Sequence, residues 1–235
     1  MKIGLAQINP VVGDIGGNSN KIISAIKKTN ADIIAFPELC ITGYSPQDLL
    51  LRKSFVDENI SALKKIIPNV KNKTAIIGFI EKIDGDLYNS AAVIQDRQIK
   101  EIHRKECLPN YSIFDEKRWF RAGNCETIFE LSGEKIGISI CEDIWMQKPS
   151  GRLKQKGAGL IINISASPYG QGKIEVIESI LKKRWEENRI PIIYVNQVGA
   201  QDGIVYYGHS MYFNDGKVIQ KCRDFEEEIL VVDVK

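Results

Sequence analysis

Hydrophobic residues in the first part of the chain follow two different spacings. Residues 3–8 and residues 31–36 form short apolar runs that are typical of β-strands. Between them, the isoleucines in residues 22–26 fall at helical intervals, and Asn18 is the expected helix N-cap after the turn-rich residues 10–17. The order predicts a β-α-β unit at the start of the chain.

The middle of the chain predicts one helix followed by an antiparallel meander. A helix is expected over residues 57–67, and strands are expected over residues 74–81, 88–95 and 98–105. The first two strands are joined across the turn residues 84–86, and a second short turn leads into the third. Such short connections favour antiparallel pairing.

Strand patterns return in the second half of the chain. The expected strands cover residues 127–131, 135–141, 159–164, 191–196, 206–213, 217–221 and 229–234. One helix is expected among them, and its apolar face is formed by Ile174, Ile177, Ile180, Leu181 and Trp185. Asn214-Asp215-Gly216 is expected to turn a late hairpin. The alternation predicts an α/β fold of sheets covered by helices, and with no repeat or linker in the sequence, residues 1–235 are expected to form a single domain.

Composition removes several classes of protein. The 235 residues are 43% hydrophobic and carry a net charge of +2 with interspersed signs, so the chain can bury a large core and does not favour nucleic acid as a partner. The five cysteines are widely spaced and form no CxxC pair, which argues against a disulfide framework or a structural zinc site and fits the cytoplasm. Neither a signal-peptide core nor an apolar run long enough for a membrane helix is expected.

Residues 107–124 fit neither period. They mix charges with Pro109, Tyr111, Phe114, Trp119 and Phe120. A segment so rich in aromatic residues is not typical of a solvated linker, so we expect a loop that lines a pocket.

Cys141 is the first candidate for chemistry. It ends the run Ile136, Ile138, Ile140 and precedes an expected helix start, so its thiol is expected to stand exposed at a sharp turn where a backbone N–H can stabilise an oxyanion. The alternative is a small buried side chain, which is what most lone cysteines are. Because Glu142 and Asp143 oppose thiolate formation, a reactive thiol here needs a nearby cation.

Lys105 and Glu38 are the matching candidates for a cation and a base. Lys105 ends a strand pattern and faces the same side as His103, where a lysine is unusual unless it is paired. Glu38 follows Pro37 at the end of an apolar run and could act as a general base. Taken singly, each residue is better explained as an ordinary side chain in water.

Two other patterns are set aside. His103 and His209 are too few and too far apart in sequence to suggest a metal site, although a dyad of Cys141 with His209 is the natural competitor of the Glu, Lys and Cys set. Residues 12–17 contain glycines but lack the Lys and Ser/Thr of a phosphate loop, so they are interpreted as a turn.

The order Phe36-Pro37-Glu38, then Lys105, then Ile140-Cys141-Glu142-Asp143 resembles the nitrilase, or carbon-nitrogen hydrolase, superfamily. Further segments are similar to one branch, the glutaminase domain of glutamine-dependent NAD synthetases. They cover residues 4–14, 39–50, 108–118, 165–169 and 194–202, so the resemblance extends over essentially the whole chain. It implies a four-layer α-β-β-α sandwich and a homo-oligomer.

The resemblance also implies roles for individual residues. It makes Glu38 the general base, Lys105 the oxyanion-stabilising lysine and Cys141 the nucleophile. The glutamine contacts that it implies are Tyr111, Ser167 and Lys173. Further pocket neighbours are Tyr44, Phe114, Glu142 and Trp145, with Glu116 as a second carboxylate near Lys105; for the aromatic residues, simple core packing is the alternative.

The implied reaction converts L-glutamine and water into L-glutamate and ammonia through a thioester, without a cofactor. Members of this branch continue into a second domain that binds ATP, Mg and deamido-NAD and uses the ammonia to make NAD. This chain ends at Lys235 before such a domain, so the expected partner is a synthetase domain either in the same polypeptide or in a separate one. Two other readings stay open: an amidase for a different small amide, and a non-catalytic docking module that regulates a synthetase.

Overall fold

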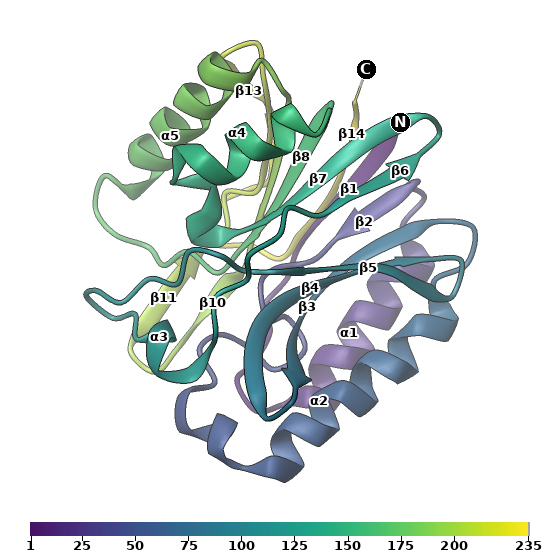
Figure 1. The fold of residues 1–235 in the computed structure, drawn as a ribbon, viewed down its shortest axis with the longest axis vertical. Helices are drawn as coiled ribbons and strands as arrows, with labels where there is room; N and C mark the ends of the chain where they lie inside the picture. Colours follow the sequence, from purple (N-terminus) through teal and green to yellow (C-terminus); the bar gives the residue numbers. More distant parts are fainter. Residues whose placement is uncertain (235) are drawn as a thin grey trace.

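Two six-stranded β-sheets, each covered by helices on its outer face, make up the computed structural model, which describes residues 1–234 (Figure 1). The first sheet has the order β14-β1-β2-β3-β4-β5. Its strands are β1 (Lys2–Gln7), β2 (Ile33–Ala35), β3 (Thr74–Ile83), β4 (Asp86–Gln95), β5 (Gln98–Arg104) and β14 (Glu228–Asp233). The helices α1 (Ile15–Lys28) and α2 (Lys53–Ile66) cover its outer face.

The second sheet has the order β13-β12-β9-β8-β7-β6. Its strands are β6 (Ile128–Leu131), β7 (Glu134–Ile140), β8 (Leu160–Ser165), β9 (Ile192–Asn196), β12 (Met211–Asn214) and β13 (Lys217–Lys221). The helices α4 (Gln147–Gln155) and α5 (Lys173–Asn188) cover it, and β10 (Val198–Gln201) and β11 (Ile204–Tyr207) form a separate hairpin. The fold is therefore the expected α-β-β-α sandwich.

Strand alternation explains the layers. In β1, Leu5 packs between the two sheets while Ala6 faces the helices α1 and α2. In the second sheet, Ile162 faces the space between the sheets and Ile161 faces α4 and α5. A strand that is buried on both faces has no polar side to show, which is why these strands are nearly continuous in apolar residues.

Each sheet has three parallel strands at its centre, flanked by antiparallel ones. The strands β1, β2 and β3 are parallel in the first sheet, as are β7, β8 and β9 in the second. The β-α-β opening, the antiparallel meander of β3, β4 and β5, and the hairpin at Asn214-Asp215-Gly216 are confirmed. Because parallel strands point the same way, the residues that follow them gather at one edge of each sheet.

The start of α1 was predicted wrongly. The helix begins at Ile15, and the Asp14 side chain accepts a hydrogen bond of 2.9 Å from the Gly17 backbone, so Asp14 and not Asn18 is the N-cap. Asn18 lies inside the helix and is buried, where its amide binds the carbonyl groups of Val11 and Ile41. The two glycines at 16 and 17, which weaken a helix, hid its first turn in the sequence.

The single strand expected over residues 206–213 was also wrong. Gly208 and His209 both have positive φ values, of 74° and 60°, and they break the run into β11 and β12. The break lacks the Asn-Gly or Asp-Gly pair that marks a tight hairpin turn, so the apolar pattern gave no sign of it. The sequence also missed α4, whose Pro149 and Gly151 disfavour a helix, and it missed β10.

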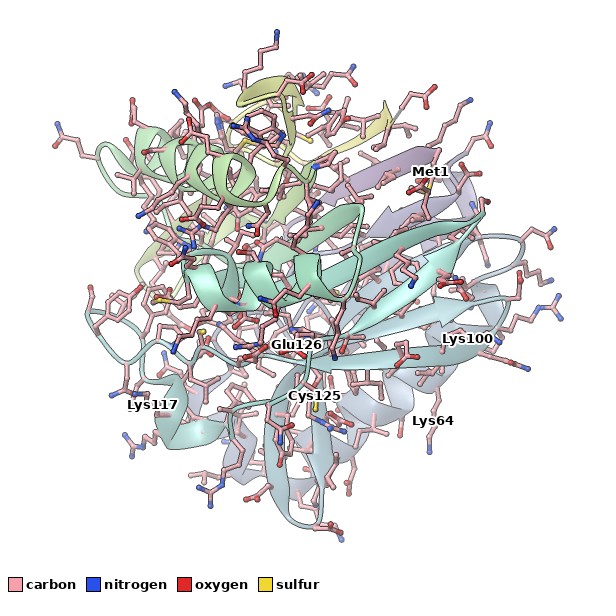
Figure 2. All side chains as sticks on the ribbon, turned by 45° about the horizontal axis from the view of Figure 1, so that its top comes forward. Met1, Lys64, Lys100, Lys117, Cys125 and Glu126 are labelled. Carbon is pink, nitrogen blue, oxygen red and sulfur yellow. The ribbon has the colours of Figure 1, made fainter. Side chains whose placement is uncertain are left out.

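The segment between β5 and β6 holds one helical turn, α3 (Glu116–Trp119), within otherwise irregular chain. Figure 2 shows Lys117 on this turn and Cys125 with Glu126 on the stretch that leads into β6. In the described part of the chain, none of the helices combines the length and apolar character that crossing a membrane requires.

Candidate active site

Glu38 lies in a tight turn after β2 and is fully buried. The turn is seated against β3 at Gly78, where an added Cβ would come within 2.4 Å of the Leu39 backbone nitrogen. Leu39 itself has a φ of 45°. The lack of a side chain at Gly78 therefore lets the turn pack close enough to aim Glu38 inward.

The Glu38 carboxylate accepts three hydrogen bonds. Lys105 donates to it over 2.6 Å and the Asn89 amide over 2.7 Å, while the Ala166 backbone N–H donates over 3.0 Å from the second sheet. A buried carboxylate needs such donors because it has lost its hydration.

Lys105 directly follows β5 and is only 1% exposed. Besides Glu38, its ammonium donates over 2.7 Å to Glu116, which also accepts a 2.7 Å hydrogen bond from the Tyr44 hydroxyl. Burial by itself would lower the pKa of Lys105, but Glu116 and Glu38 raise it well above its ordinary value. Lys105 is therefore held as a permanent cation between two carboxylates.

Glu116 has a raised pKa. Burial raises this pKa most, Lys105 lowers it and Glu38 raises it, and the net result is a rise from 4.5 to about 7. The structure thus brings Glu116 to Lys105 as expected.

Cys141 follows β7 and begins a 3₁₀ turn over Cys141–Ile144. Its φ of 44° is the sharp, left-handed geometry of a strand that turns at once into a helix, as the sequence predicted. The thiol is not exposed, however, since Cys141 is 5% accessible. The Asn163 amide lies 3.5 Å from the Cys141 carbonyl oxygen.

The charges of Glu38 and Lys105 both act on the Cys141 thiol. Burial raises its pKa well above the ordinary value, the Glu38 carboxylate raises it further, and Lys105 lowers it. Glu116 and Glu142 contribute smaller increases. The thiol is therefore protonated at rest, with a carboxylate and an ammonium close enough to influence it.

Several of the expected pocket residues meet in one cluster. Phe114 packs against Tyr44 and Tyr111, at ring-centre distances of 6.4 and 5.5 Å. The Tyr111 hydroxyl donates over 2.9 Å to Glu142, the residue next to Cys141. Because Tyr44 also binds Glu116, these aromatic residues connect the Lys105 side of the site with the Cys141 side.

Lys173 and Trp145 form a second contact near the thiol. The Lys173 ammonium lies 4.1 Å from the centre of the Trp145 ring, a cation-π contact. Partial burial lowers the pKa of Lys173, and the nearby Cys141 and Glu142 oppose that shift. Lys173 is thus a half-buried cation near the nucleophile candidate.

Ser167 follows β8 and is buried. Its backbone is fixed by Asn196, whose side chain accepts from the Ser167 N–H over 2.8 Å and donates to its carbonyl over 3.1 Å. Burial raises the pKa of Tyr207 and the hydroxyls of Tyr194 and Ser167 lower it in part, with a net rise to about 12. Ser167 therefore sits beside two buried tyrosine hydroxyls.

His209 does not reach Cys141. Its Nδ1 lies 2.7 Å from Asp224 and its Nε2 lies 3.0 Å from Glu178, so carboxylates engage both ring nitrogens. The alternative Cys and His dyad is excluded by these contacts. Among residues 1–234, no group of three or more His, Cys, Asp or Glu side chains is arranged to hold a metal ion.

Three asparagines that shape this site were not expected from the sequence, and Asp143 was expected in another role. Asn89 orients Glu38, Asn163 contacts the Cys141 carbonyl, Asn196 fixes Ser167, and Asp143 bonds backbone groups beside both Lys105 and Cys141. Buried polar side chains within apolar strands are the signal that could have found the three asparagines, because such groups need specific partners.

Comparison with known proteins places the chain in context. The carbon-nitrogen hydrolase family model matches residues 2–235. A curated protein from Aquifex aeolicus, named glutamine-dependent NAD(+) synthetase, is 43% identical over 99% of this chain, and one of the same name from Thermotoga maritima is 41% identical over 100%. The chain spans 42% of the length of each.

Solved structures of similar fold include the same kind of synthetase and an amidase. A glutamine-dependent NAD+ synthetase from Acinetobacter baumannii, in complex with adenosine diphosphate, superposes with a TM-score of 0.92 at 36% identity, over 98% of this chain and 44% of that one. An amidase of the nitrilase superfamily from Nesterenkonia AN1 superposes with a TM-score of 0.89 at 21% identity, over 100% of this chain and 90% of that one. The second match supports the fold alone.

Proposed function

The chain belongs to the carbon-nitrogen hydrolase family, and from this premise we propose that it hydrolyses the side-chain amide of L-glutamine through a thioester on Cys141. The observation that carries the proposal is the buried ion cluster in which Lys105 bonds both Glu38 and Glu116, and whose charges act on the Cys141 thiol. Burying three charged groups together costs stability, so a chemical role is the best account of their retention.

In the proposed first half-reaction, Glu38 accepts the proton of the Cys141 thiol as sulfur attacks the amide carbon. The carbonyl oxygen becomes an anion, which the Lys105 ammonium and a backbone N–H of the turn after Cys141 stabilise. Collapse of this intermediate breaks the carbon–nitrogen bond. Glu38 returns the proton to the leaving nitrogen, so ammonia departs and a thioester remains.

In the second half-reaction, Glu38 takes a proton from water as the water oxygen attacks the thioester carbon. The carbon–sulfur bond breaks, glutamate leaves, and the proton returns to the sulfur. Proton transfer to a positioned carboxylate contributes a factor of about 10² to 10⁴ in such reactions. The raised pKa of Cys141 fits this scheme, since the thiol keeps its proton until a substrate displaces water and brings an electrophile.

The other pocket residues suit the charged end of glutamine, which carries an α-carboxylate and an α-ammonium group. The half-buried Lys173 ammonium suits the α-carboxylate, and the Glu142 carboxylate, held by Tyr111, suits the α-ammonium group. Ser167 adds a hydroxyl from the end of β8. A simple aliphatic amide has neither charge, so this pair of opposite charges favours glutamine over other small amides.

We further propose that residues 1–235 act as one glutaminase domain whose ammonia is used to convert deamido-NAD into NAD. The names of the Aquifex aeolicus and Thermotoga maritima relatives support this, as does the part of their length that lies outside the match. The hydrolysis itself uses no cofactor in this scheme. ATP, Mg and deamido-NAD would bind a synthetase domain, joined to this chain or separate from it.

The test is mass spectrometry of the protein after treatment with an electrophilic glutamine analogue. A single adduct on Cys141, prevented by excess glutamine but not by excess acetamide, supports both the nucleophile and the substrate. The exposed Cys125 serves as an internal control for indiscriminate alkylation. An adduct on Cys125 alone, or equal protection by acetamide, would overturn the proposal.

A further inference from the structure

Asp143 lies between the two strand ends that supply Lys105 and Cys141. Its Oδ1 accepts hydrogen bonds from the backbone N–H groups of Glu106, over 3.1 Å, and Cys107, over 2.7 Å. Its Oδ2 accepts from the backbone N–H of Ile140 over 3.2 Å. One side chain therefore binds the two residues after Lys105 and the residue before Cys141.

The Asp143 side chain is itself held in place. It is 1% exposed, and its Oδ2 lies 3.4 Å from Nε2 of His103, a residue of β5 that is 3% exposed. The other ring nitrogen of His103 lies 3.3 Å from the Thr127 hydroxyl, at the start of β6. His103 thus fixes the carboxylate from the same strand that leads into Lys105.

These contacts cross from one sheet to the other. Lys105 follows β5 of the first sheet, and Cys141 follows β7 of the second. The sheets pack through apolar side chains, which are not directional, so packing alone does not fix the offset of one strand end from the other. Hydrogen bonds are directional, and three of them converge on a single buried carboxylate.

A second set of contacts also links the segment after Lys105 to the second sheet. Arg152 of α4, which covers the second sheet, bonds the carboxylates of Glu106 and Glu126. Glu106 lies directly after Lys105, and Glu126 lies on the stretch leading into β6 (Figure 2). Arg152 is 36% exposed, however, so the buried Asp143 contacts are the ones that can set a distance closely.

We propose that Asp143 is a positioning residue that fixes the Lys105 ammonium relative to the Cys141 sulfur. The proposal rests on the proposed function only in that it takes these two groups as the reacting pair. From its place next to Cys141 in the sequence, Asp143 was expected to act on the thiol by its charge. The geometry gives it a different task, because both of its oxygens face backbone donors.

Replacing Asp143 with Asn separates these two tasks. The amide cannot accept on both sides, so the join between the strand ends loosens, and kcat for glutamine is expected to fall about 10- to 100-fold with little change in KM. The rate at which iodoacetamide alkylates Cys141 at pH 7.5 gives a readout without glutamine. Loosening moves the Lys105 cation away and slows alkylation, whereas removal of a nearby anion would by itself lower the pKa of the thiol and speed it.

Asn59→Ala is the matched control. Asn59 is also fully buried and also bonds backbone groups, in this case the N–H and carbonyl of Ile80, so its loss lowers stability without touching the join. At temperatures where both variants are folded, N59A is expected to keep the wild-type kcat and alkylation rate. If D143N alkylates as fast as the wild type or faster, the positioning role is wrong, whether or not the protein hydrolyses glutamine.

Hydrogen exchange of the wild-type protein tests the proposal without any variant. The Glu106 and Cys107 side chains are partly exposed, so their amides should exchange quickly unless Asp143 protects them. We expect peptides that contain these two amides to exchange at least tenfold more slowly than those containing Ser112 and Ile113 in the same loop. Equal exchange in the two regions would overturn the proposal even if D143N failed to fold.

Discussion

Lys105 and Glu116 form a buried ion pair of 2.7 Å, and Glu116 lies eleven residues further along the chain, on the helical turn α3. The pair ties the irregular segment after β5 to the strand end that carries Lys105. It also sets the charge of the site, since two carboxylates face one ammonium.

Glu116 should make stability depend on pH. With a pKa raised from 4.5 to about 7, the folded protein holds a proton on Glu116 that the unfolded chain releases, so its contribution to stability is lost as pH rises from about 4.5 to about 7. Gln at this position does not titrate. Urea unfolding between pH 4.5 and 8 should therefore show Glu116→Gln gaining stability relative to the wild type across that window. Parallel curves would contradict the raised pKa.

Cys141→Ala should abolish ammonia release while leaving the fold intact. Only a sulfur atom is lost, so the cavity is small, and the melting temperature is expected to change by a few degrees at most. His209→Ala provides the contrast, because it leaves Asp224 and Glu178 without their partner and should lower stability while retaining kcat in the folded fraction. A loss of kcat in H209A equal to that in C141A would revive the Cys and His dyad.

The positions of the three central residues could be predicted because each lies just after a strand pattern. Glu38 follows β2, Lys105 follows β5 and Cys141 follows β7. Strand periodicity is local, so the sequence carries it. The distance between one strand end and another is not local, and it depends on how the two sheets pack.

The parts that were missed have local causes. Asn18 was read as a cap because it precedes the apolar stripe, although Asp14 makes the capping hydrogen bond and Asn18 satisfies backbone groups from the neighbouring loop. Asp143 was read as a charge next to a thiol, since nothing in the sequence shows that three backbone N–H groups surround it. Polar side chains that serve distant backbone groups leave no periodic pattern.

Gly78→Ala should displace the turn that carries Glu38 and so lower activity. The added methyl group would lie 2.4 Å from the Leu39 nitrogen and 2.5 Å from the Pro37 carbonyl oxygen, and because both are backbone atoms the whole turn that carries Glu38 must move. We expect kcat to fall at least tenfold, with a loss of stability of about 1–3 kcal/mol.

The matched control is Gly16→Ala in α1, where nothing lies within 4 Å of an added Cβ. That variant should gain up to about 1 kcal/mol and keep full activity, as measured by urea unfolding and an ammonia assay. Equal kcat in the two variants would show that the Gly78 contact does not aim Glu38.

Lys173→Met should raise KM for glutamine much more than it lowers kcat. Met keeps most of the aliphatic packing on Trp145 but removes the cation proposed to bind the α-carboxylate, which is far from the reacting amide. A lost charge-assisted contact of about 1.5–3 kcal/mol corresponds to a KM increase of about 10- to 150-fold. Lys182→Met, on the same helix but exposed, is the control and should leave KM unchanged. The decisive comparison uses glutamine and a glutamine analogue that lacks the α-carboxylate. K173M should lose its penalty with the analogue, and a penalty that persists would assign Lys173 to packing and not to substrate recognition.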